Sequence, residues 1–263
     1  MEIAVLTLAL LFYTVGVVLS FFGFTRKAPR LHRFSAGILT GAWAFHLVAI
    51  LQRGWAEGGM PLSNAAEFLL VLGWAVLSLY LLIWLRWRVD IAGLVLPPLA
   101  ALMVISAIGL FRGSSGPVPY SASPWWFVIH TTASTIGLAA LGVSFAMSLI
   151  FLVQDRALKS KTSFRLLERL PSLDTCDRIG HEALLWGFPL LTLGIVTGFV
   201  RIFTARDHLG VSSPKELFPV VAWILFAVLL FARLSVGYRG RRSAWVTIAA
   251  FLICLMTVIG IAR

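Results

Sequence analysis

Charged side chains are scarce in this chain of 263 residues, since Asp, Glu, Lys and Arg together make up 13% of it, against about 25% in soluble domains. Hydrophobic residues make up 59%. A soluble fold has too little interior to hide so much apolar surface, so the composition excludes a soluble globular protein. It predicts a polytopic membrane protein, whose apolar helices face the lipid bilayer.

Cysteine is nearly absent, because the chain has only Cys176 and Cys254. We place Cys176 in a loop on the inner side of the membrane and Cys254 within an apolar run, so a disulfide between them is not expected. The sequence also has no Cys-x-x-Cys-His motif. This excludes a c-type cytochrome that carries its own covalent haem.

Eight apolar runs follow one another along the chain, each suited to the ~20 residues that a helix needs to cross a bilayer. Lipid offers no hydrogen-bond partners to a backbone, so each run is expected to be helical, including the first, which is interpreted as a retained span. The predicted fold class is all-α, a polytopic helical bundle forming a single transmembrane domain over residues 1–263. The predicted spans are 3–24, 34–52, 65–85, 91–111, 125–153, 178–203, 216–236 and 243–262.

Basic residues are distributed unequally between the two ends of these spans. Of the 22 lysines and arginines, 16 flank one side and 6 the other. The more basic side of a membrane protein faces the cytoplasm, so both termini are predicted to lie outside. The net charge of +11 is explained by this topology, and no nucleic-acid partner is expected. The predicted inner residues are Arg26, Lys27, Arg30, Arg33, Arg86, Arg88, Arg156, Lys159, Lys161, Arg165, Arg169, Arg178, Arg233, Arg239, Arg241 and Arg242.

Prolines and one basic segment add local predictions. Pro97, Pro98 and Pro189 fall within predicted spans, where proline can bend a helix, although plain packing is the preferred explanation for them. Residues 157–170, ALKSKTSFRLLERL, are predicted to form a short basic amphipathic helix on the inner membrane surface. This helix serves as an anchor or, alternatively, as a docking face for a cytosolic partner.

The stretch GGMPLSNAAEFLLVLGWA, residues 58–75, places an acidic residue just inside an apolar run. Asn64 is predicted to cap the helix, with Glu67 three residues later reaching back to the free backbone amides of the first turn. Capping alone accounts for Glu67. A role beside a bound ligand is the alternative that the sequence leaves open.

Two histidines fall inside predicted spans near the outer side. His46 lies about 10 Å, and His130 about 7 Å, below the outer boundary at ~1.5 Å per residue. Ionisable residues inside a membrane are costly and indicate functional sites. A similar depth on different helices suits two axial ligands of one haem iron, so His46 and His130 are candidate metal ligands. The alternative is that each histidine only hydrogen-bonds a neighbouring helix.

The stretch HTTASTIG begins at His130 and continues on one helix face with Ser134 and Gly137. A helix face that carries a small polar residue and then a glycine allows close approach by a flat ligand or by another helix. Helix packing is the commoner reason for such a pattern.

Other residues near the outer side are weaker candidates. Arg112, Arg201 and Arg206 can pair with haem propionates, although rim arginines are more often only solvated. His208, in the outer loop before the seventh span, is a reserve haem ligand. His32 and His181 belong to the inner side and are assigned no role.

Four stretches, taken in this order, resemble the cytochrome c assembly superfamily, which includes CcsA-type and CcmC-type haem-handling proteins and the related HemX-like proteins. GGMPLSNAAEFLLVLGWA resembles the superfamily's Gly-His-x-Pro-x-Ser-Asn-x-x-Glu start of a span. WWFVIHTTASTIGLAALGVSFAMSLIFLV resembles the span headed by an outer histidine, at His130. LPSLDTCDRIGHEALLWGFPLLTLGIVTG and the last two spans also match, and His46 resembles the second-span histidine. The resemblance covers about residues 40–262.

The chain departs from this pattern at the outer surface. The superfamily's tryptophan-rich loop corresponds to RDHLGVSS, which has no tryptophan. Ser213 stands where an Asp is usual, and Phe231 stands in place of a histidine of the seventh span. The sequence ends at Arg263, before the outer histidine that follows the last span in CcsA-type proteins. We therefore expect the scaffold and two histidines without the external haem-presenting surface, nearest to the HemX-like branch.

The resemblance implies an integral protein of the bacterial inner membrane that binds haem non-covalently and assists cytochrome c assembly, together with other assembly proteins and without being an enzyme. In this interpretation Glu67 lies beside the haem entry region. One alternative is a HemX-like membrane partner of a cytosolic tetrapyrrole-synthesis enzyme. A second alternative, based on the outer arginines, is a transporter of small organic anions.

Overall fold

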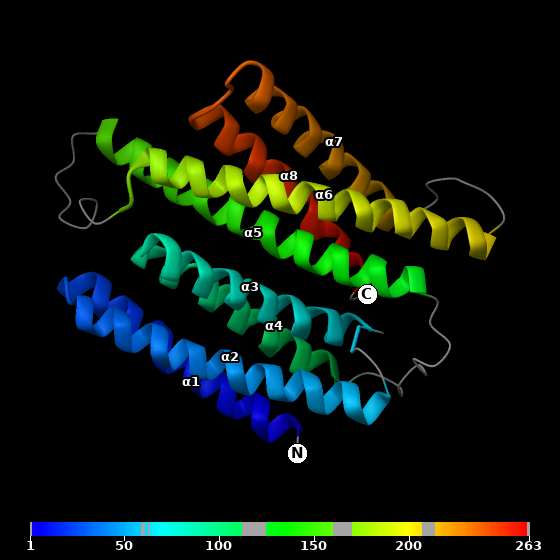
Figure 1. Cartoon of the computed structure of the whole chain (residues 1–263), viewed down its shortest axis with the longest axis horizontal. Coiled ribbons are helices and arrows are strands. Elements are labelled where there is room, and N and C mark those ends of the chain that lie inside the picture. The colour runs from blue at the N-terminus through cyan, green and yellow to red at the C-terminus, as the bar shows by residue number, and fades with distance from the viewer. Residues whose placement is uncertain are drawn as a thin grey trace. The chain divides into compact units, whose positions relative to one another are not determined.

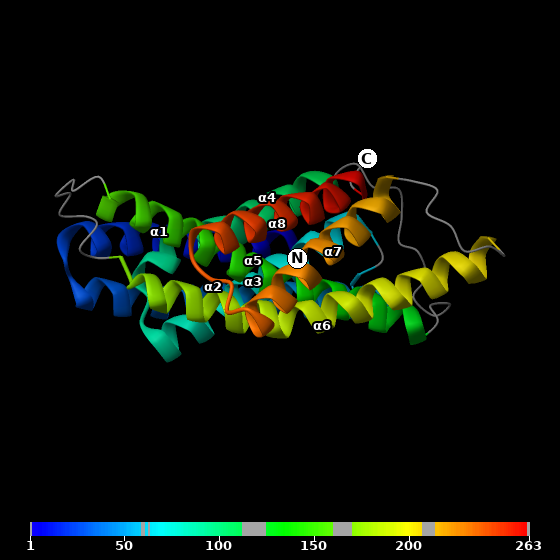
Figure 2. The same cartoon turned by 90° about the horizontal axis from the view of Figure 1, so that it is seen from above.

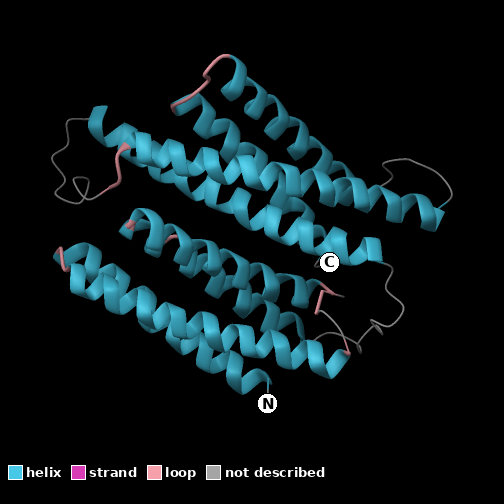
Figure 3. Cartoon of the chain, viewed as in Figure 1, coloured by secondary structure: helices cyan, strands magenta, loops and turns pink. Residues whose placement is uncertain are grey.

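The computed structural model of the protein describes residues 2–58, 61–62, 64–111, 125–159, 170–206 and 214–261. These residues contain eight α-helices, one short 3-10 helix (η1) and no β-strand (Figure 1, Figure 3). The predicted all-α fold class is confirmed. The helices are α1 (Glu2–Arg26), α2 (Pro29–Glu57), α3 (Ala65–Trp87), η1 (Asp90–Leu94), α4 (Leu96–Phe111), α5 (Trp125–Lys159), α6 (Leu173–Arg206), α7 (Pro214–Ser235) and α8 (Arg241–Ile261).

Most of these helices are suited to a membrane. Among the described residues, seven segments are long and apolar enough to cross one, namely α1 to α7 with η1 counted together with α4. The remaining helix, α8, has 21 residues, close to the 22 of α7. The protein is therefore a multi-pass membrane protein, as predicted. The orientation with both termini outside stays a prediction.

Several helices are longer than the predicted spans because their charged ends continue the same helix. α2 begins at Pro29 rather than at residue 34, with a proline in its first turn, where the missing N–H is not needed. α6 begins at Leu173, so Cys176 lies in its first turn and not in a loop as predicted. Both cysteines are free thiols, and the sequence predicted no disulfide between them.

Two of the three prolines considered lie at the start of a helix, and the third lies inside one. Pro97 and Pro98 occupy the first turn of α4, where their missing N–H groups break no helical hydrogen bond. The span predicted over residues 91–111 is broken at Val95, just before these prolines, where η1 ends and α4 begins. Pro189 does lie inside α6.

The predicted amphipathic helix 157–170 is described only at its two ends. Residues 157–159 continue α5, and residues 160–169 lie outside the described part of the chain. This surface helix stays a prediction.

The chain divides into two compact units, Met1–Ala122 and Ser123–Arg263. Within each unit the helices run antiparallel in sequence order (Figure 1, Figure 2). Whether the two units behave as the single transmembrane domain predicted from the sequence stays a prediction.

In the first unit, α1 packs against α2, and α3 packs against α4. Gly16 and Gly41 allow α1 and α2 to approach closely, because an added Cβ would come within 2.6 Å of Leu39 and 2.8 Å of Phe12 respectively. His32 lies 3.5 Å from the carboxylate of Asp90. This contact places the α1–α2 turn and the start of η1 at the same end of the unit, where the basic residues Arg26, Lys27, Arg30, Arg33, Arg86 and Arg88 also lie.

In the second unit, α5 and α6 pack closely along a stripe of small residues. A Cβ on Gly137 would lie 2.9 Å from the backbone nitrogen of Leu191, and one on Gly187 would lie 3.1 Å from the Gly137 carbonyl. Gly194 packs directly on Ser134. The bare face that follows His130 is therefore used by helix packing, the commoner of the two causes that the sequence allowed.

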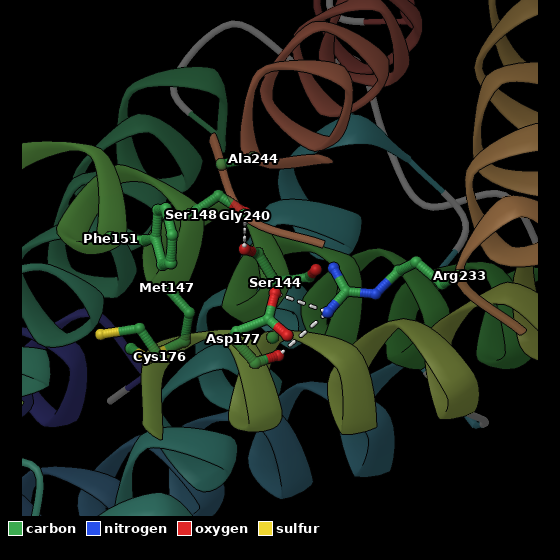
Figure 4. A pocket seen from close by; sticks show the side chains of 10 residues that line it. Ser144, Met147, Ser148, Phe151, Cys176, Asp177, Arg233, Gly240 and Ala244 are labelled. Carbon is green, nitrogen blue, oxygen red and sulfur yellow. Dashed lines mark hydrogen bonds and ion pairs between the residues drawn. The ribbon is translucent and has the colours of Figure 1, made fainter. Parts of the chain in front are cut away.

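Arg233 contacts two other helices at one end of the second unit, and Figure 4 shows its ion pair with Asp177. Arg233 on α7 donates hydrogen bonds to the Asp177 carboxylate of α6 at 2.7 Å and to the Ser243 hydroxyl of α8 at 2.7 Å. The Arg233 side chain is only 6% exposed. It lines a small pocket together with Ser144, Ser148 and Cys176. The start of α6, the end of α7 and the start of α8 therefore lie together.

Candidate functional site

His46 is fully buried inside the first unit, with none of its surface exposed. Its Nδ1 atom lies 3.1 Å from the hydroxyl of Tyr13 on α1, and the two rings meet edge to face. Its Nε2 atom is also buried and has no hydrogen-bond partner in the described structure. Buried polar atoms are nearly always paired, so this nitrogen indicates a missing partner.

The α3 helix offers a bare surface to the His46 ring. A Cβ on Gly73 would lie 3.6 Å from Cε1 of His46 and 3.1 Å from the Ala100 carbonyl of α4. The backbone carbonyl of Leu70, one turn earlier on α3, faces the imidazole as a hydrogen-bond acceptor, although it does not reach hydrogen-bond geometry with Nε2. Because Gly73 has no side chain, backbone rather than side chain borders the ring on this side.

Two stacked tryptophans lie at the contact between α2 and α3, which we call the α2–α3 seam. Trp43 and Trp74 stack with ring centroids 5.4 Å apart, and Trp43 donates a hydrogen bond to the Ser78 hydroxyl. The Trp74 indole nitrogen is buried without a partner, as is Oε1 of Gln52. Three buried polar atoms of α2 and α3, one of them His46 Nε2, therefore have no hydrogen-bond partner in the described structure.

An ion pair between Arg53 and Glu67 joins the end of α2 to the start of α3. Glu67 is fully buried, and its Oε1 atom accepts hydrogen bonds from Nε and Nη2 of Arg53 at 3.1 and 3.0 Å. The Arg53 guanidinium also lies 4.3 Å from the ring centre of Phe111. Asn64 caps α3 by accepting a hydrogen bond from the Glu67 backbone at 2.9 Å, as predicted. Glu67 is therefore both part of a capped turn and half of a buried ion pair.

His130 lies near the start of α5 in the second unit. Its Nδ1 atom is 2.7 Å from the backbone carbonyl of Gly194 on α6. A carbonyl only accepts, so Nδ1 carries the proton and the lone pair of the neutral ring is on Nε2. Gly198 borders the ring, because a Cβ there would come within 3.0 Å of Cε1. The Gly194 carbonyl therefore selects the His130 tautomer with its lone pair on Nε2, which is the form that binds a metal through Nε2. Gly198 leaves room for the ring.

The remaining predicted outer residues are not described. Arg112 and His208, and the side chains of Arg201 and Arg206, lie outside the described part of the structure, so their roles stay predictions. Phe231, which stands in place of a family histidine, is 72% exposed on α7.

The two histidines predicted to lie on the inner side, His32 and His181, have charged neighbours. His32 pairs with Asp90. His181 lies on α6 close to the charges of Asp177 and Arg233, and its Nδ1 is buried without a partner. Among the described His, Cys, Asp and Glu residues, no group of three is arranged to hold a metal ion.

Sequence reasoning missed two partners of the residues it selected. Neither Arg53, the partner of Glu67, nor Tyr13, the partner of His46, was among the candidate residues. The signal for Arg53 was available, because an arginine near the end of one span and a glutamate at the start of the next have opposite charges at one depth.

These features define a multi-pass membrane protein with a fully buried histidine, His46, in its first unit and a half-buried histidine, His130, in its second. Residues 62–262 match the family model described as "Cytochrome C assembly protein". The chain belongs to this family, as the resemblance in the sequence indicated.

Curated relatives agree with this assignment. The chain is 27% identical over 264 residues to "Cytochrome c biogenesis protein CcsA" of Microcystis aeruginosa, covering 82% of this chain and 80% of the relative. It is 28% identical over 236 residues to the protein of the same name from a Synechococcus species, covering 81% and 78%.

A solved structure shares the fold. "Cytochrome c Heme Lyase CcmF" superposes with a TM-score of 0.72 at 18% sequence identity, covering all of this chain and 46% of that protein. The chain therefore corresponds to less than half of the solved protein, and at this identity the similarity concerns the fold alone.

Proposed function

We propose that this protein handles haem in the membrane and assists cytochrome c assembly, with His46 as an axial ligand of non-covalently bound haem. The observation that carries the proposal is the buried Nε2 atom of His46, which has no partner among the described residues. A neutral imidazole nitrogen with a free lone pair is a good ligand for haem iron.

The surroundings of His46 fit a haem group. Gly73 keeps side-chain bulk away from the ring, and the neighbouring Trp43–Trp74 stack is aromatic, like the flat macrocycle. The unpartnered Trp74 indole N–H can donate to an acceptor on the ligand, such as a propionate. When bound, haem supplies an iron centre that changes its redox state. The chain's own residues hold the imidazole, exclude water and close the α2–α3 seam through Arg53 and Glu67.

His130 is the second candidate ligand. Its support is the hydrogen bond to the Gly194 carbonyl, which leaves the lone pair on Nε2. Ligation of one haem iron by both His46 and His130 stays a prediction, as does haem pairing by the outer arginines.

The family and its members support this role. The curated relatives are named for cytochrome c biogenesis, and the structural neighbour is named as a haem lyase. We extend cytochrome c assembly from these proteins to this chain and place it in a bacterial inner membrane. We assign no catalytic residue, and the partners expected are other assembly proteins.

A deletion strain tests the proposal. Removing the gene is expected to reduce haem covalently attached to c-type cytochromes, measured by haem staining of membrane proteins in gels. Wild type and the inner control His32→Ala should restore staining, whereas His46→Ala should not. Normal staining in the deletion strain would contradict the proposal, and a changed level of tetrapyrrole precursors alongside it would favour the regulatory alternative.

A further inference from the structure

We propose that Tyr13 is the positioning residue for His46, and that its hydroxyl lets the imidazole exchange between a resting tautomer and a metal-binding tautomer. The contact between these two side chains is observed. Its role toward haem iron rests on the proposed function. Tyr13 is the partner of His46 Nδ1 in the same way that the Gly194 carbonyl is the partner of His130 Nδ1, but the chemistry of the two partners differs.

The position of the Tyr13 hydroxyl is fixed by packing. Tyr13 is fully buried on α1, and its ring centre lies 6.1 Å from that of His46 at an interplanar angle of 68°. Gly16, one turn from Tyr13, packs against Leu39, which lies two turns from His46. Phe12 and Phe45, the sequence neighbours of Tyr13 and His46, contact each other edge to face at 5.1 Å. These contacts hold α1 and α2 in register. Because Tyr13 and His46 are both fully buried, bulk water does not replace the hydroxyl beside Nδ1.

A hydroxyl can donate or accept, whereas a carbonyl can only accept. In one arrangement the Tyr13 O–H donates to Nδ1, and the ring proton is on Nε2, which then cannot bind a metal. In the other arrangement Nδ1–H donates to the Tyr13 oxygen, and the lone pair is on Nε2. Both arrangements hold the same number of protons, so the net charge of the site is the same in each. The proton passes from Nε2 to Nδ1 through a water molecule, the carrier that this exchange requires.

The tautomer with a lone pair on Nε2 is therefore held more firmly at His130 than at His46. At His130 the Gly194 carbonyl admits only the tautomer with a lone pair on Nε2. At His46 the Tyr13 hydroxyl admits both tautomers at one heavy-atom geometry. His46 can thus present either a proton or a lone pair on Nε2 while the Tyr13 oxygen stays in place.

The substitution Tyr13→Phe tests this role, because it removes one oxygen and keeps the ring. A matched control is Tyr80→Phe, which removes an equally buried hydroxyl in the same unit. Tyr80 contacts Ser20 and lies ten residues, or about 15 Å along the helix, from Leu70. If either variant fails to fold in detergent, far-UV circular dichroism and gel filtration will show it.

Two measurements apply to these proteins. The first is ¹⁵N NMR of histidine-labelled haem-free protein, with the His46 signals assigned by their loss in His46→Ala. Tyr13→Phe should shift the His46 nitrogen signals and leave the other histidines unchanged, while Tyr80→Phe should leave His46 unchanged. The second is titration with haem, for which Tyr13→Phe should weaken binding about 10- to 100-fold, as expected when the partner of a ligating histidine is lost.

The outcomes separate this inference from the proposed function. His46 signals and haem affinity that are the same in Tyr13→Phe and wild type would overturn the role of Tyr13. Equal shifts in Tyr13→Phe and Tyr80→Phe would also overturn it, because they would indicate a general packing effect. If wild type binds no haem, the proposed function fails, and the NMR comparison still decides whether Tyr13 positions the His46 ring.

Discussion

Arg53 and Glu67 form a buried ion pair in which both hydrogen bonds from the guanidinium end on one carboxylate oxygen, at 3.1 and 3.0 Å. The pair joins the last turns of α2 to the first turn of α3. Its partners are unequally buried, since the Glu67 side chain has no exposed surface and Arg53 is 20% exposed. A buried charge that loses its counterion is strongly destabilising, so the more buried partner decides the cost.

Arg53→Gln should therefore destabilise the protein more than Glu67→Gln does. The first change leaves a fully buried carboxylate without this counterion, at a cost of about 3–5 kcal/mol. The second leaves a partly exposed guanidinium that still lies over Phe111. Thermal unfolding in detergent, followed by circular dichroism, gives the order of the two variants. A smaller loss for Arg53→Gln than for Glu67→Gln would contradict this account of the pair.

Asp177→Asn should also be costly, because Arg233 is nearly buried and hydrogen-bonds the Asp177 carboxylate. We expect a loss of about 3–5 kcal/mol. The matched control is Asp155→Asn, which breaks the pair with Lys159 one turn along α5. Lys159 is 63% exposed, and such surface pairs contribute only about 0.3–0.5 kcal/mol. Equal unfolding temperatures for the two variants would show that the Arg233 pair does not stabilise the second unit.

Gly198→Ala should displace His130. The added methyl group would come within 3.0 Å of Cε1 and 3.2 Å of Nδ1, and overpacking of this kind costs about 1–3 kcal/mol. Gly109→Ala is the control, because a Cβ there meets nothing within 4 Å and should stabilise the helix by roughly 0.5–1 kcal/mol. The two changes are thus expected to move the unfolding temperature in opposite directions. A stabilising effect of Gly198→Ala would mean that α6 does not confine the histidine.

Accessibility labelling tests the predicted orientation. In a variant with Cys176 and Cys254 changed to Ala, a new cysteine at Ala56 should react with a membrane-impermeant maleimide in intact cells. A cysteine at Val236 should react only after the cells are opened. The expectation follows from the excess of lysine and arginine on the predicted inner side. Labelling of Val236→Cys in intact cells, with protection of Ala56→Cys, would reverse the topology.

The class of fold could be predicted from the sequence because apolar runs of membrane length are a local property of the chain. The Asn64 cap was predicted for the same reason, since its acceptor and the Glu67 amide are three residues apart. Helix ends were less accurate. Charged residues near the membrane surface continue α2 and α6 beyond the apolar run, so hydropathy alone placed their starts five residues too late.

Contacts between helices could not be predicted in this way. The pairing of Tyr13 with His46 spans 33 residues and depends on how α1 and α2 are rotated about their axes. The seat of His130 on Gly194 spans 64 residues and depends on the glycine stripe between α5 and α6. The sequence indicates that a buried histidine needs a partner, but only packing determines which residue supplies it.

The haem content of the purified protein tests the central proposal most directly. Wild-type protein, purified in detergent and assayed by the pyridine haemochrome method with an absorption spectrum, should contain haem with the spectrum of a histidine-ligated iron. His46→Ala should contain much less haem, or show a high-spin spectrum that added imidazole restores, because an axial ligand is lost. His32→Ala, at the opposite end of the same unit, should match wild type. Wild-type protein without haem even when haem is supplied, or a His46→Ala variant with unchanged content and spectrum, would contradict the account.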